Sequence, residues 1–205
     1  MMLALVQTAR AIDNDHDGMS DVWQSLYGVG SEQAADDPDG DGDSNLREAW
    51  AGTDPGDPNS NSRLNNSRTA DQVTLTWSGV TKMPYIVETS TNLISWSQVG
   101  GQVVSLGDTE TASGSLSSTV KRYYRLRIRS TLDTDSDNLR DWEEFIVGTS
   151  ESSWDTDGDL MSDGWEYTYM LDPSINDAGD DADGDEVSNF DEYLNGTNPQ
   201  DPGSF

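Results

Sequence analysis

Polar and apolar residues alternate in the middle of the chain, within residues 70–130. The alternation is clear in Val73–Ser78, Tyr85–Thr89, Gln102–Leu106 and Tyr123–Arg129. Successive side chains of a strand point to opposite faces, so each of these segments is predicted to be a strand. About five or six short strands in one segment are typical of a small β-sandwich.

The segments on either side carry a different pattern, in which short helix signals follow acidic clusters. Trp23 and Tyr27 are four residues apart and predict one apolar helix face. Leu46–Ala51 is predicted to form about two helical turns that end at Gly52, because glycine favours the left-handed backbone of a helix C-cap. The chain is therefore predicted to be a multi-domain α+β protein, in which short loop-and-helix repeats flank a small all-β sandwich. The same helix-and-stop signal recurs in residues 145–149 and 193–199.

The acidic clusters have the spacing of a calcium-binding loop. Asp37, Asp39 and Asp41 alternate, Gly42 follows them, and Glu48 stands at the twelfth position of the window. In an EF-hand loop, oxygen ligands occupy positions 1, 3 and 5, a glycine turns the chain at position 6, and a bidentate glutamate occupies position 12. This arrangement suits a hard divalent cation that takes many oxygen ligands. We predict that Ca²⁺ binds here.

The same spacing occurs five times, so we interpret the acidic runs as metal sites and not as solvated, flexible segments. The first loop ends in Gln24, a neutral and weaker ligand than the glutamate that ends the other four. The predicted metal ligands are Asp13, Asp15, Asp17 and Asp21 in the first loop, Asp37, Asp39, Asp41 and Glu48 in the second, Asp133, Asp135, Asp137 and Glu144 in the third, Asp155, Asp157, Asp159 and Glu166 in the fourth, and Asp181, Asp183, Asp185 and Glu192 in the fifth.

Two departures from the EF-hand pattern change the expected unit. Position 8 is normally aliphatic, but here it is Arg140 in the third loop and serine in the other four, and the apolar residue often stands at position 7. No long helix precedes most loops, so we expect units of one loop and one helix. Position 6 is Leu160 in the fourth loop and Glu186 in the fifth, where a left-handed backbone costs roughly 1–2 kcal/mol. This strain argues against the regular turn in those two loops.

Residues 13–60 and 155–204 are two copies of one two-loop unit. The motifs MSD-x-W and SN-x-x-E-x-x-x-GT each occur once in both segments. Repeats of this period generally stack, because each buries a face that it cannot bury alone. The predicted domains are a terminal segment at 1–12, two calcium loops at 13–60, a polar linker at 61–69, the sandwich at 70–130, and three calcium loops at 131–205.

Composition supports bound cations. Only 33% of the 205 residues are hydrophobic, and the formal net charge is −28. Such a charge favours an expanded chain, yet the 7 Trp and 7 Tyr are too many for a disordered acidic tail. Bound calcium reconciles the two observations, because it cancels charge locally and lets the short helices dock. A nucleic acid partner is not expected, since its phosphates would meet an acidic surface.

Cellular location is only weakly encoded. The chain has no cysteine, so disulfides do not stabilise it. No stretch approaches the length of a membrane helix, and we predict no membrane span. Met1–Ala11 contains a short apolar run that ends in Ala-Arg-Ala. This segment fits either the end of a secretion signal or a frayed terminus.

Catalysis is not expected from this sequence. The only histidine, His16, stands at position 4 of the first loop and points away from the cation, so no Ser–His–Asp or Cys–His set can be built around it. A carboxylate pair could act as acid and base in a glycosidase, but each clustered carboxylate already has a place in a loop. We predict that the protein is not an enzyme.

Two features of the sandwich segment leave alternatives open. Trp77 and Trp96 either pack in the core and at strand edges or form a carbohydrate-binding platform. Arg125, Arg127 and Arg129 alternate on one strand and share one face. They either form a solvated face or contact carboxylates of a neighbouring repeat that are not used by calcium.

The loop strings DTDGDLMSDGWE and DNDHDGMSDVWQ resemble bacterial thrombospondin type-3-like repeats. The strings LTW, YIVETSTNLISW and RYYRLRI resemble a fibronectin-type-III-like module. The resemblance implies Ca²⁺ binding and a structural or adhesive module of a secreted or cell-surface protein, with a protein or a surface polysaccharide as partner. Two alternatives are a dockerin-like docking module and a carbohydrate-associated accessory domain of a secreted enzyme.

Overall fold

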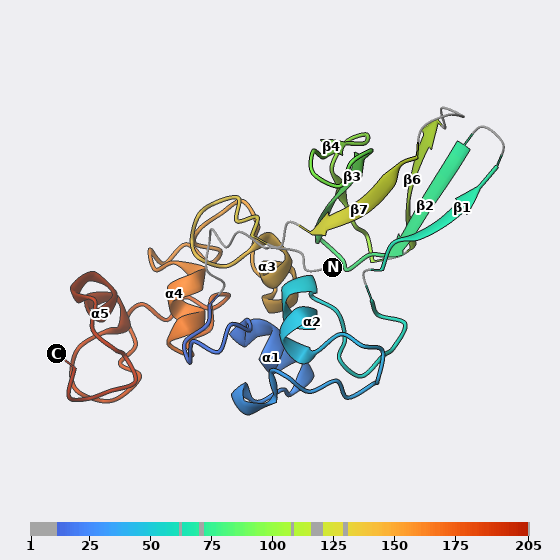
Figure 1. Ribbon diagram of the computed structural model, residues 1–205. Helices are drawn as coiled ribbons and strands as arrows, with labels where there is room; N and C mark the ends of the chain where they lie inside the picture. Colours follow the sequence, from blue (N-terminus) through green and yellow to red (C-terminus); the bar gives the residue numbers. More distant parts are fainter. Residues whose placement is uncertain are drawn as a thin grey trace. The chain divides into compact units, whose positions relative to one another are not determined.

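The computed structural model describes residues 12–61, 63–69, 72–107, 109–115, 121–128 and 131–204. These residues form a mixed α+β protein with two antiparallel sheets and five α-helices (Figure 1), which confirms the predicted fold class. The chain divides into two compact units, one consisting mainly of Asp133–Phe205 and the other of Asp17–Leu132. The segment Met1–Ala11, interpreted as a secretion signal or a frayed end, lies outside the described residues.

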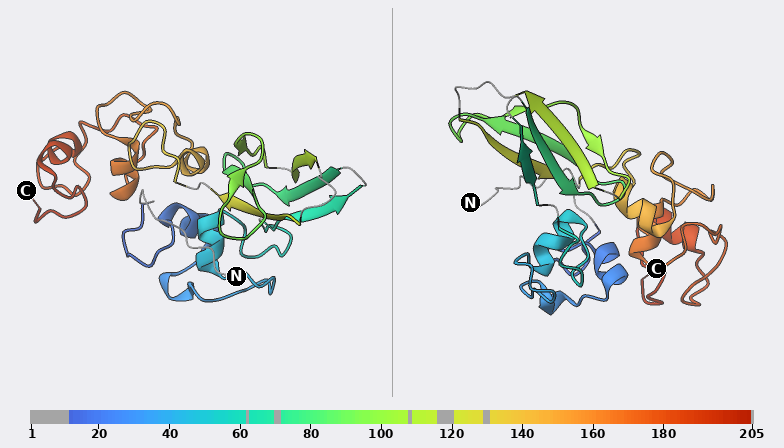
Figure 2. Two further views of the ribbon diagram at one scale, coloured as in Figure 1. Left: turned by 45° about the horizontal axis from the view of Figure 1, so that its top comes forward. Right: turned by 90° about the vertical axis from the view of Figure 1, so that its right-hand side faces the viewer.

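Both sheets belong to the second unit and together form a β-sandwich-like arrangement. In the first sheet, β2 lies between β1 and β6 (Figures 1 and 2). In the second sheet, β3 pairs with β4, β5 and β7. The strands are β1 (Asn65–Arg68), β2 (Gln72–Ser78), β3 (Pro84–Ser90), β4 (Ser97–Gln98), β5 (Val103–Val104), β6 (Thr109–Ser115) and β7 (Tyr123–Ile128).

The predicted alternation in β2 produces the core of this region. Val73, Leu75 and Trp77 are buried, and the residues between them are more exposed. The Trp77 ring packs against Tyr85 of β3, with 5.9 Å between the ring centroids. Because Trp77 is only 1% exposed, it does not form a surface platform with Trp96.

Three strands, β1, β4 and β6, lie outside the segments predicted to be strands, and β1 and β6 are the longer two. Strand β1 lies inside the segment expected to be a polar linker, and all four of its residues are exposed. Strand β6 reads TETASGS and has no large apolar residue. Both strands pair with β2 along its length, for example Asn66 and Ala112 with Leu75. Backbone pairing with a strongly alternating neighbour holds these polar strands, so their own sequences carry little signal.

One helix follows each acidic loop, as expected for units of one loop and one helix. Each helix begins at position 9 of its loop, so position 12 falls in its first turns. A short 3₁₀ helix, η1 (Ser31–Gln33), lies between the first two. The helices are α1 (Asp21–Tyr27), α2 (Asn45–Ala51), α3 (Asp141–Val147), α4 (Asp163–Thr168) and α5 (Asn189–Asn195).

The unusual residues at positions 7 and 8 are explained by these helices. Position 8 is the N-cap of all five helices, where serine is favoured over an aliphatic residue. The Ser188 hydroxyl accepts a hydrogen bond from the Asp191 N–H at 3.2 Å. In three loops position 7 turns into the core instead, and Met19, Leu139 and Met161 are fully buried.

The ends of the helices also follow the sequence. Gly52 caps α2 with a φ of 72°, and Gly148 and Gly196 end α3 and α5 in the same left-handed conformation. This confirms the helix-and-stop signal. Within the described residues, no helix has the length and apolar character needed to cross a membrane.

The two predicted copies share their backbone hydrogen bonds. The Asn45 N–H donates to the Asp36 carbonyl and the Asn189 N–H donates to the Asp180 carbonyl, each at 2.8 Å. The turns after α2 and α5 also match, since the Ser60 and Ser204 hydroxyls accept from the N–H groups of residues 54 and 198. The second loop and helix of the two copies therefore share these local contacts.

Candidate metal centres

The aspartate at position 1 holds loops two to five in their turns. In the fourth loop, the Asp155 carboxylate accepts hydrogen bonds from the N–H groups of Gly158 at 2.7 Å and Leu160 at 2.9 Å. These donors stand at positions 4 and 6. The aspartates Asp37, Asp133 and Asp181 accept from the corresponding N–H groups of their own loops.

The backbone is left-handed at positions 4 and 6 of all five loops. Leu160 and Glu186 keep this conformation, with φ of 75° and 76°. The expectation that strain would disturb their turns is therefore wrong. The reason is visible in the fourth loop, where the Leu160 N–H bonds to Asp155 and Met161, next in sequence, is anchored in the core.

In the second loop, the aspartates at positions 3 and 5 each use one carboxylate oxygen for the loop and leave the other without a hydrogen bond. The Oδ1 atom of Asp41 accepts from the N–H of Asp43 at 2.8 Å. The Oδ2 atoms of Asp39 and Asp41 are buried and accept no hydrogen bond from the described chain. Groups whose ligand atoms all lie within 4.8 Å of one another are Asp13–Asp15–Asp17, Asp37–Asp39–Asp41, Asp133–Asp135–Asp137 and Asp155–Asp157–Asp159.

The fifth loop repeats this geometry. Asp183 and Asp185 accept through Oδ1 from the N–H groups two residues ahead, at 3.2 and 2.8 Å. Their Oδ2 atoms are buried, and no described group donates to them.

The glutamates at position 12 are almost completely buried. Glu144, Glu166 and Glu192 are 0% exposed and Glu48 is 2% exposed. Both carboxylate oxygens of Glu144, Glu166 and Glu192, and Oε2 of Glu48, accept no hydrogen bond from the described residues. Leaving a carboxylate charged in such a place costs several kcal/mol unless a cation compensates it.

The pKa values of three of these glutamates are raised in the chain without a cation, because burial disfavours their charged form. Burial, together with the nearby Asp39, raises the pKa of Glu48 to about 7. Burial and Asp135 raise the pKa of Glu144 to about 8. Burial and Asp159 raise the pKa of Glu166 to about 9. Each site therefore requires positive charge at neutral pH, either from protons or from a metal ion.

The residues present fit a hard divalent cation. Each of loops two to five places a bidentate-capable glutamate at position 12 of a loop with three alternating aspartates, and all of these ligand atoms are oxygens. Oxygen ligands of this number suit Ca²⁺, Mg²⁺ or Mn²⁺, whereas Zn²⁺ and Cu⁺ prefer nitrogen and sulfur.

Position 9 has a structural role that the sequence did not suggest. The Asp163 carboxylate accepts from the N–H of Thr156 at 2.8 Å and from its hydroxyl at 2.6 Å. Asp141 bonds to Thr134 in the same way. In the third and fourth loops, position 9 therefore closes the loop onto position 2. Its counterpart in the first loop, Asp21, was predicted to be a metal ligand, and it stands at the first residue of α1.

The first loop differs at its twelfth position. The Gln24 side-chain amide donates to Oδ2 of Asp17 at 2.9 Å. His16 is exposed, and its Nδ1 lies 2.9 Å from the Asn14 carbonyl. The amide of Gln24 thus supplies a hydrogen-bond donor where the other loops place a carboxylate.

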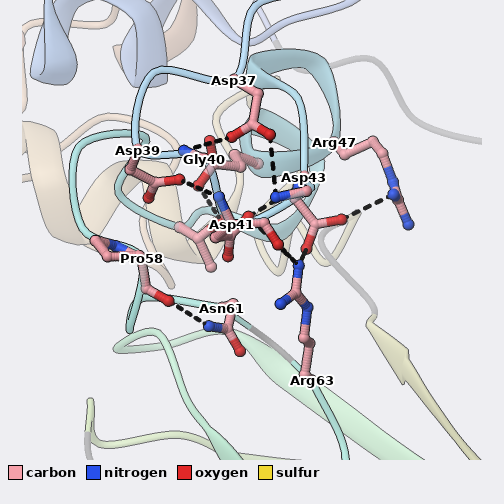
Figure 3. Close-up of polar contacts among 12 residues, drawn as sticks. Asp37, Asp39, Gly40, Asp41, Asp43, Arg47, Pro58, Asn61 and Arg63 are labelled. Carbon is pink, nitrogen blue, oxygen red and sulfur yellow. Dashed lines mark hydrogen bonds and ion pairs between the residues drawn. The ribbon is translucent and has the colours of Figure 1, made fainter.

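Arginines approach the second loop (Figure 3). The Arg63 guanidinium contacts the Asp41 carbonyl and lies 3.5 Å from Oδ1 of Asp41 and 3.4 Å from the Asp43 carboxylate. Arg47 pairs with Asp43 at 2.8 Å. This loop therefore has positive charge beside its ligands before any cation binds, a feature that its local sequence does not reveal.

The arginines of β7 have a partner in the same sheet. Arg125 Nε lies 2.7 Å and Arg127 Nε 3.6 Å from the Glu88 carboxylate on β3. The Arg125 guanidinium also stacks over Trp96, 4.2 Å from the ring centroid. Arg129 lies outside the described residues. Arg125 and Arg127 thus have a carboxylate partner within the sandwich, a contact that the sequence analysis did not consider.

Comparison of the chain with protein-family models, with curated proteins and with solved structures found no match.

Proposed function

We propose that this chain is a calcium-binding structural or adhesive module of a secreted or cell-surface protein, and that it has no catalytic role. The observation that supports the proposal best is the group of four buried position-12 glutamates. Seven of their eight carboxylate oxygens accept no hydrogen bond from the described residues, and each glutamate belongs to a loop of alternating aspartates.

Calcium is favoured over the other hard cations by the ligand set. Ca²⁺ accepts bidentate carboxylates and irregular sets of about six to eight oxygens, whereas Mg²⁺ requires near-octahedral geometry and keeps several waters. A loop of three aspartates followed by a buried glutamate offers the carboxylate-rich, irregular set of oxygens that suits Ca²⁺. The resemblance of the loops to thrombospondin type-3-like repeats supports the same ion.

We infer a structural role for calcium because the short helices of the acidic repeats are not stable by themselves. Each unit consists of a loop and a helix of six or seven residues, which is too short to be stable alone. Calcium would join the loop to the first turns of the helix through position 12. The resemblance of residues 70–130 to a fibronectin-type-III-like module fits an extracellular spacer.

Calcium titration tests the proposal directly. The full chain, stripped with a chelator, is titrated with Ca²⁺ by calorimetry, with Mg²⁺ as the control ion. We expect several calcium ions to bind more tightly than magnesium and helical circular dichroism to increase. Binding to the folded state alone should stabilise it by roughly 3 kcal/mol at a hundredfold excess over Kd. Unchanged helix content and melting temperature after chelation would contradict the proposal.

A further inference from the structure

Three carboxylates from two segments meet beside α4. Asp159 and Glu166 belong to the fourth loop, whereas Asp177 lies eleven residues beyond the end of this loop, in the segment that leads to the fifth. One ligand oxygen of each lies within 4.8 Å of the others. Since Ca²⁺ holds its oxygens at about 2.3–2.6 Å, ligands on opposite sides of one ion are separated by about this distance.

Two of the three carboxylates, Asp159 and Glu166, are buried, and three oxygens of the group lack a donor among the described residues. Glu166 is 0% exposed, and neither of its carboxylate oxygens accepts a hydrogen bond from the described residues. Oδ1 of Asp177 is likewise buried without a donor. Asp159 is 6% exposed, and its Oδ2 accepts from the Ala178 N–H at 3.1 Å. This last bond fixes the backbone next to Asp177 against the loop.

The first copy of the two-loop unit has one carboxylate and two amides at the corresponding positions. Asn45 Nδ2 donates to the Gln33 carbonyl at 2.9 Å, and Asn189 Nδ2 donates to the Asp177 carbonyl at 3.0 Å. These matching bonds make Gln33 the counterpart of Asp177.

The aspartate of this group occurs in both copies, whereas the other two acids are amides in the first copy. Gln24 replaces Glu166 and Gln33 replaces Asp177, while Asp17 corresponds to Asp159. The Gln24 amide satisfies Asp17 Oδ2 at 2.9 Å. The charge of the group changes from three carboxylates to one, and a hydrogen-bond donor stands in place of a carboxylate. The second copy, which lacks that donor, needs a cation at this point.

We propose that Asp177 is a ligand of the cation of the fourth loop, together with Asp159 and Glu166. The inference rests on the proposed calcium function and adds a ligand from outside the twelve-residue loop. A cation held in this way ties the segment before the fifth loop to α4. Binding at the fourth loop therefore orders the approach to the fifth, and the first copy of the unit lacks this link.

Neutralising Asp177 tests the assignment, with Asp180 as a matched control. Asp180 lies three residues away in the same segment and is exposed, so Asp180→Asn removes the same charge outside the group. In calcium titrations of the full chain, we expect Asp177→Asn to weaken one site by about tenfold or more, as loss of a metal-site partner does. Asp180→Asn should keep the affinities of the parent.

The amide of Ala178 gives a local readout. In ¹⁵N NMR spectra of the parent chain, its signal should move on calcium addition, and in Asp177→Asn it should move only at higher calcium. Equal affinities and equal Ala178 titrations in the Asp177→Asn and Asp180→Asn variants would overturn the inference while leaving the loops as calcium sites. A parent chain that binds no calcium would overturn both this inference and the proposed function.

A gain-of-function variant does not depend on how Asp177→Asn folds. Gln24→Glu with Gln33→Asp installs the three-carboxylate group in the first copy, and Gln24→Glu with Gln33→Asn is its neutral match. We expect the variant with Gln33→Asp to bind calcium at the first copy about tenfold more tightly than its match. Equal affinities of the two double variants would contradict a ligand role for this position.

Discussion

At the scale of single residues, the acidic side chains of the loops have two different roles: some shape the turn, and others leave a buried carboxylate without a hydrogen-bond donor. The Asp155 carboxylate shapes the turn by accepting backbone N–H groups. Glu166 is instead buried with no described donor. The first kind of acid is satisfied without metal, and the second is not. Substitutions at position 12 are therefore the most informative about the metal.

The first prediction concerns the position-12 carboxylate of the second loop. Glu48→Gln keeps the size of the side chain but removes the charge that a bidentate ligand supplies, so the affinity of one calcium site should fall by about tenfold or more. Glu32→Gln changes an exposed glutamate of η1 and should leave all affinities unchanged. Calorimetric titration of both variants measures the difference. Equal affinities of Glu48→Gln and the parent would argue against a ligand role of Glu48.

The second prediction concerns Arg63. Its guanidinium lies 3.5 Å from Asp41 Oδ1 and 3.4 Å from Asp43, so it repels an incoming cation. Because Arg63 is half exposed, its effect should not exceed about 1 kcal/mol, or roughly fivefold in affinity. Arg63→Gln should therefore tighten calcium binding at the second loop by a few-fold, most clearly at low salt.

The matched control is Arg68→Gln, which removes the same charge from β1. If both arginine variants tighten calcium binding equally at low salt, the effect is one of net charge and not of the Arg63 contact.

At the scale of elements, the short helices depend on contacts with the neighbouring loop-and-helix repeat. Within Asp133–Phe205, Oδ2 of Asp137 accepts from the Gly164 N–H at 3.1 Å, which joins the third loop to the start of α4. Within Asp17–Leu132, Trp23 and Trp50 join the first two repeats. Their indole N–H groups donate to the Thr53 and Gly18 carbonyls at 2.8 and 2.9 Å. Helices of two turns persist because contacts of this kind replace the length that they lack.

The third prediction tests the contact between the third loop and α4. A Cβ atom at Gly164 would overlap the Asp137 carbonyl oxygen and crowd the Leu139 backbone. Gly164→Ala should therefore lower the free energy of unfolding of the calcium-loaded chain by about 1–3 kcal/mol, as overpacking does. At Gly179 an added Cβ meets nothing within 4 Å, and Gly179→Ala should be neutral. Thermal melts of both variants measure the difference. Equal melting temperatures of Gly164→Ala and Gly179→Ala would show that the backbone at Asp137 can move away from an added Cβ atom.

At the scale of the whole molecule, two sources of stability are distributed along the chain. The sheets have a core of apolar residues that includes Leu75, Trp77 and Tyr85. The acidic segments bury many of their charged groups beside a few aromatics, in a chain of net charge −28. Each calcium ion brings two positive charges to these segments, so its removal should affect them and not the sheets.

The fourth prediction follows from this division. Of the seven tryptophans, Trp77 and Trp96 lie in the segment of the two sheets and the other five in the acidic segments. In ¹⁵N NMR spectra of the full chain, excess chelator should collapse those five indole signals toward disordered positions. The signals of Trp77 and Trp96 should stay dispersed. Loss of all seven signals would show that the sheets also depend on calcium.

The sequence by itself determined the features that depend on near neighbours. The loop turns arise from carboxylates that bond to N–H groups three and five residues ahead, and the helix ends from residues such as Ser188 and Gly196 at the helix boundaries. Alternation likewise determined β2. These interactions are complete within about a dozen residues, so a local pattern predicts them.

The tertiary structure decided which charges lack partners and which segments meet. The burial of Glu166, the approach of Asp177 to it, the pairing of Arg125 with Glu88 and the recruitment of the polar strand β6 all join residues distant in sequence. Local propensity does not encode such contacts, because they depend on how separate elements pack. The aspartates of the loops could thus be predicted from spacing alone, whereas the cost of leaving their glutamates without a cation became visible only in the fold.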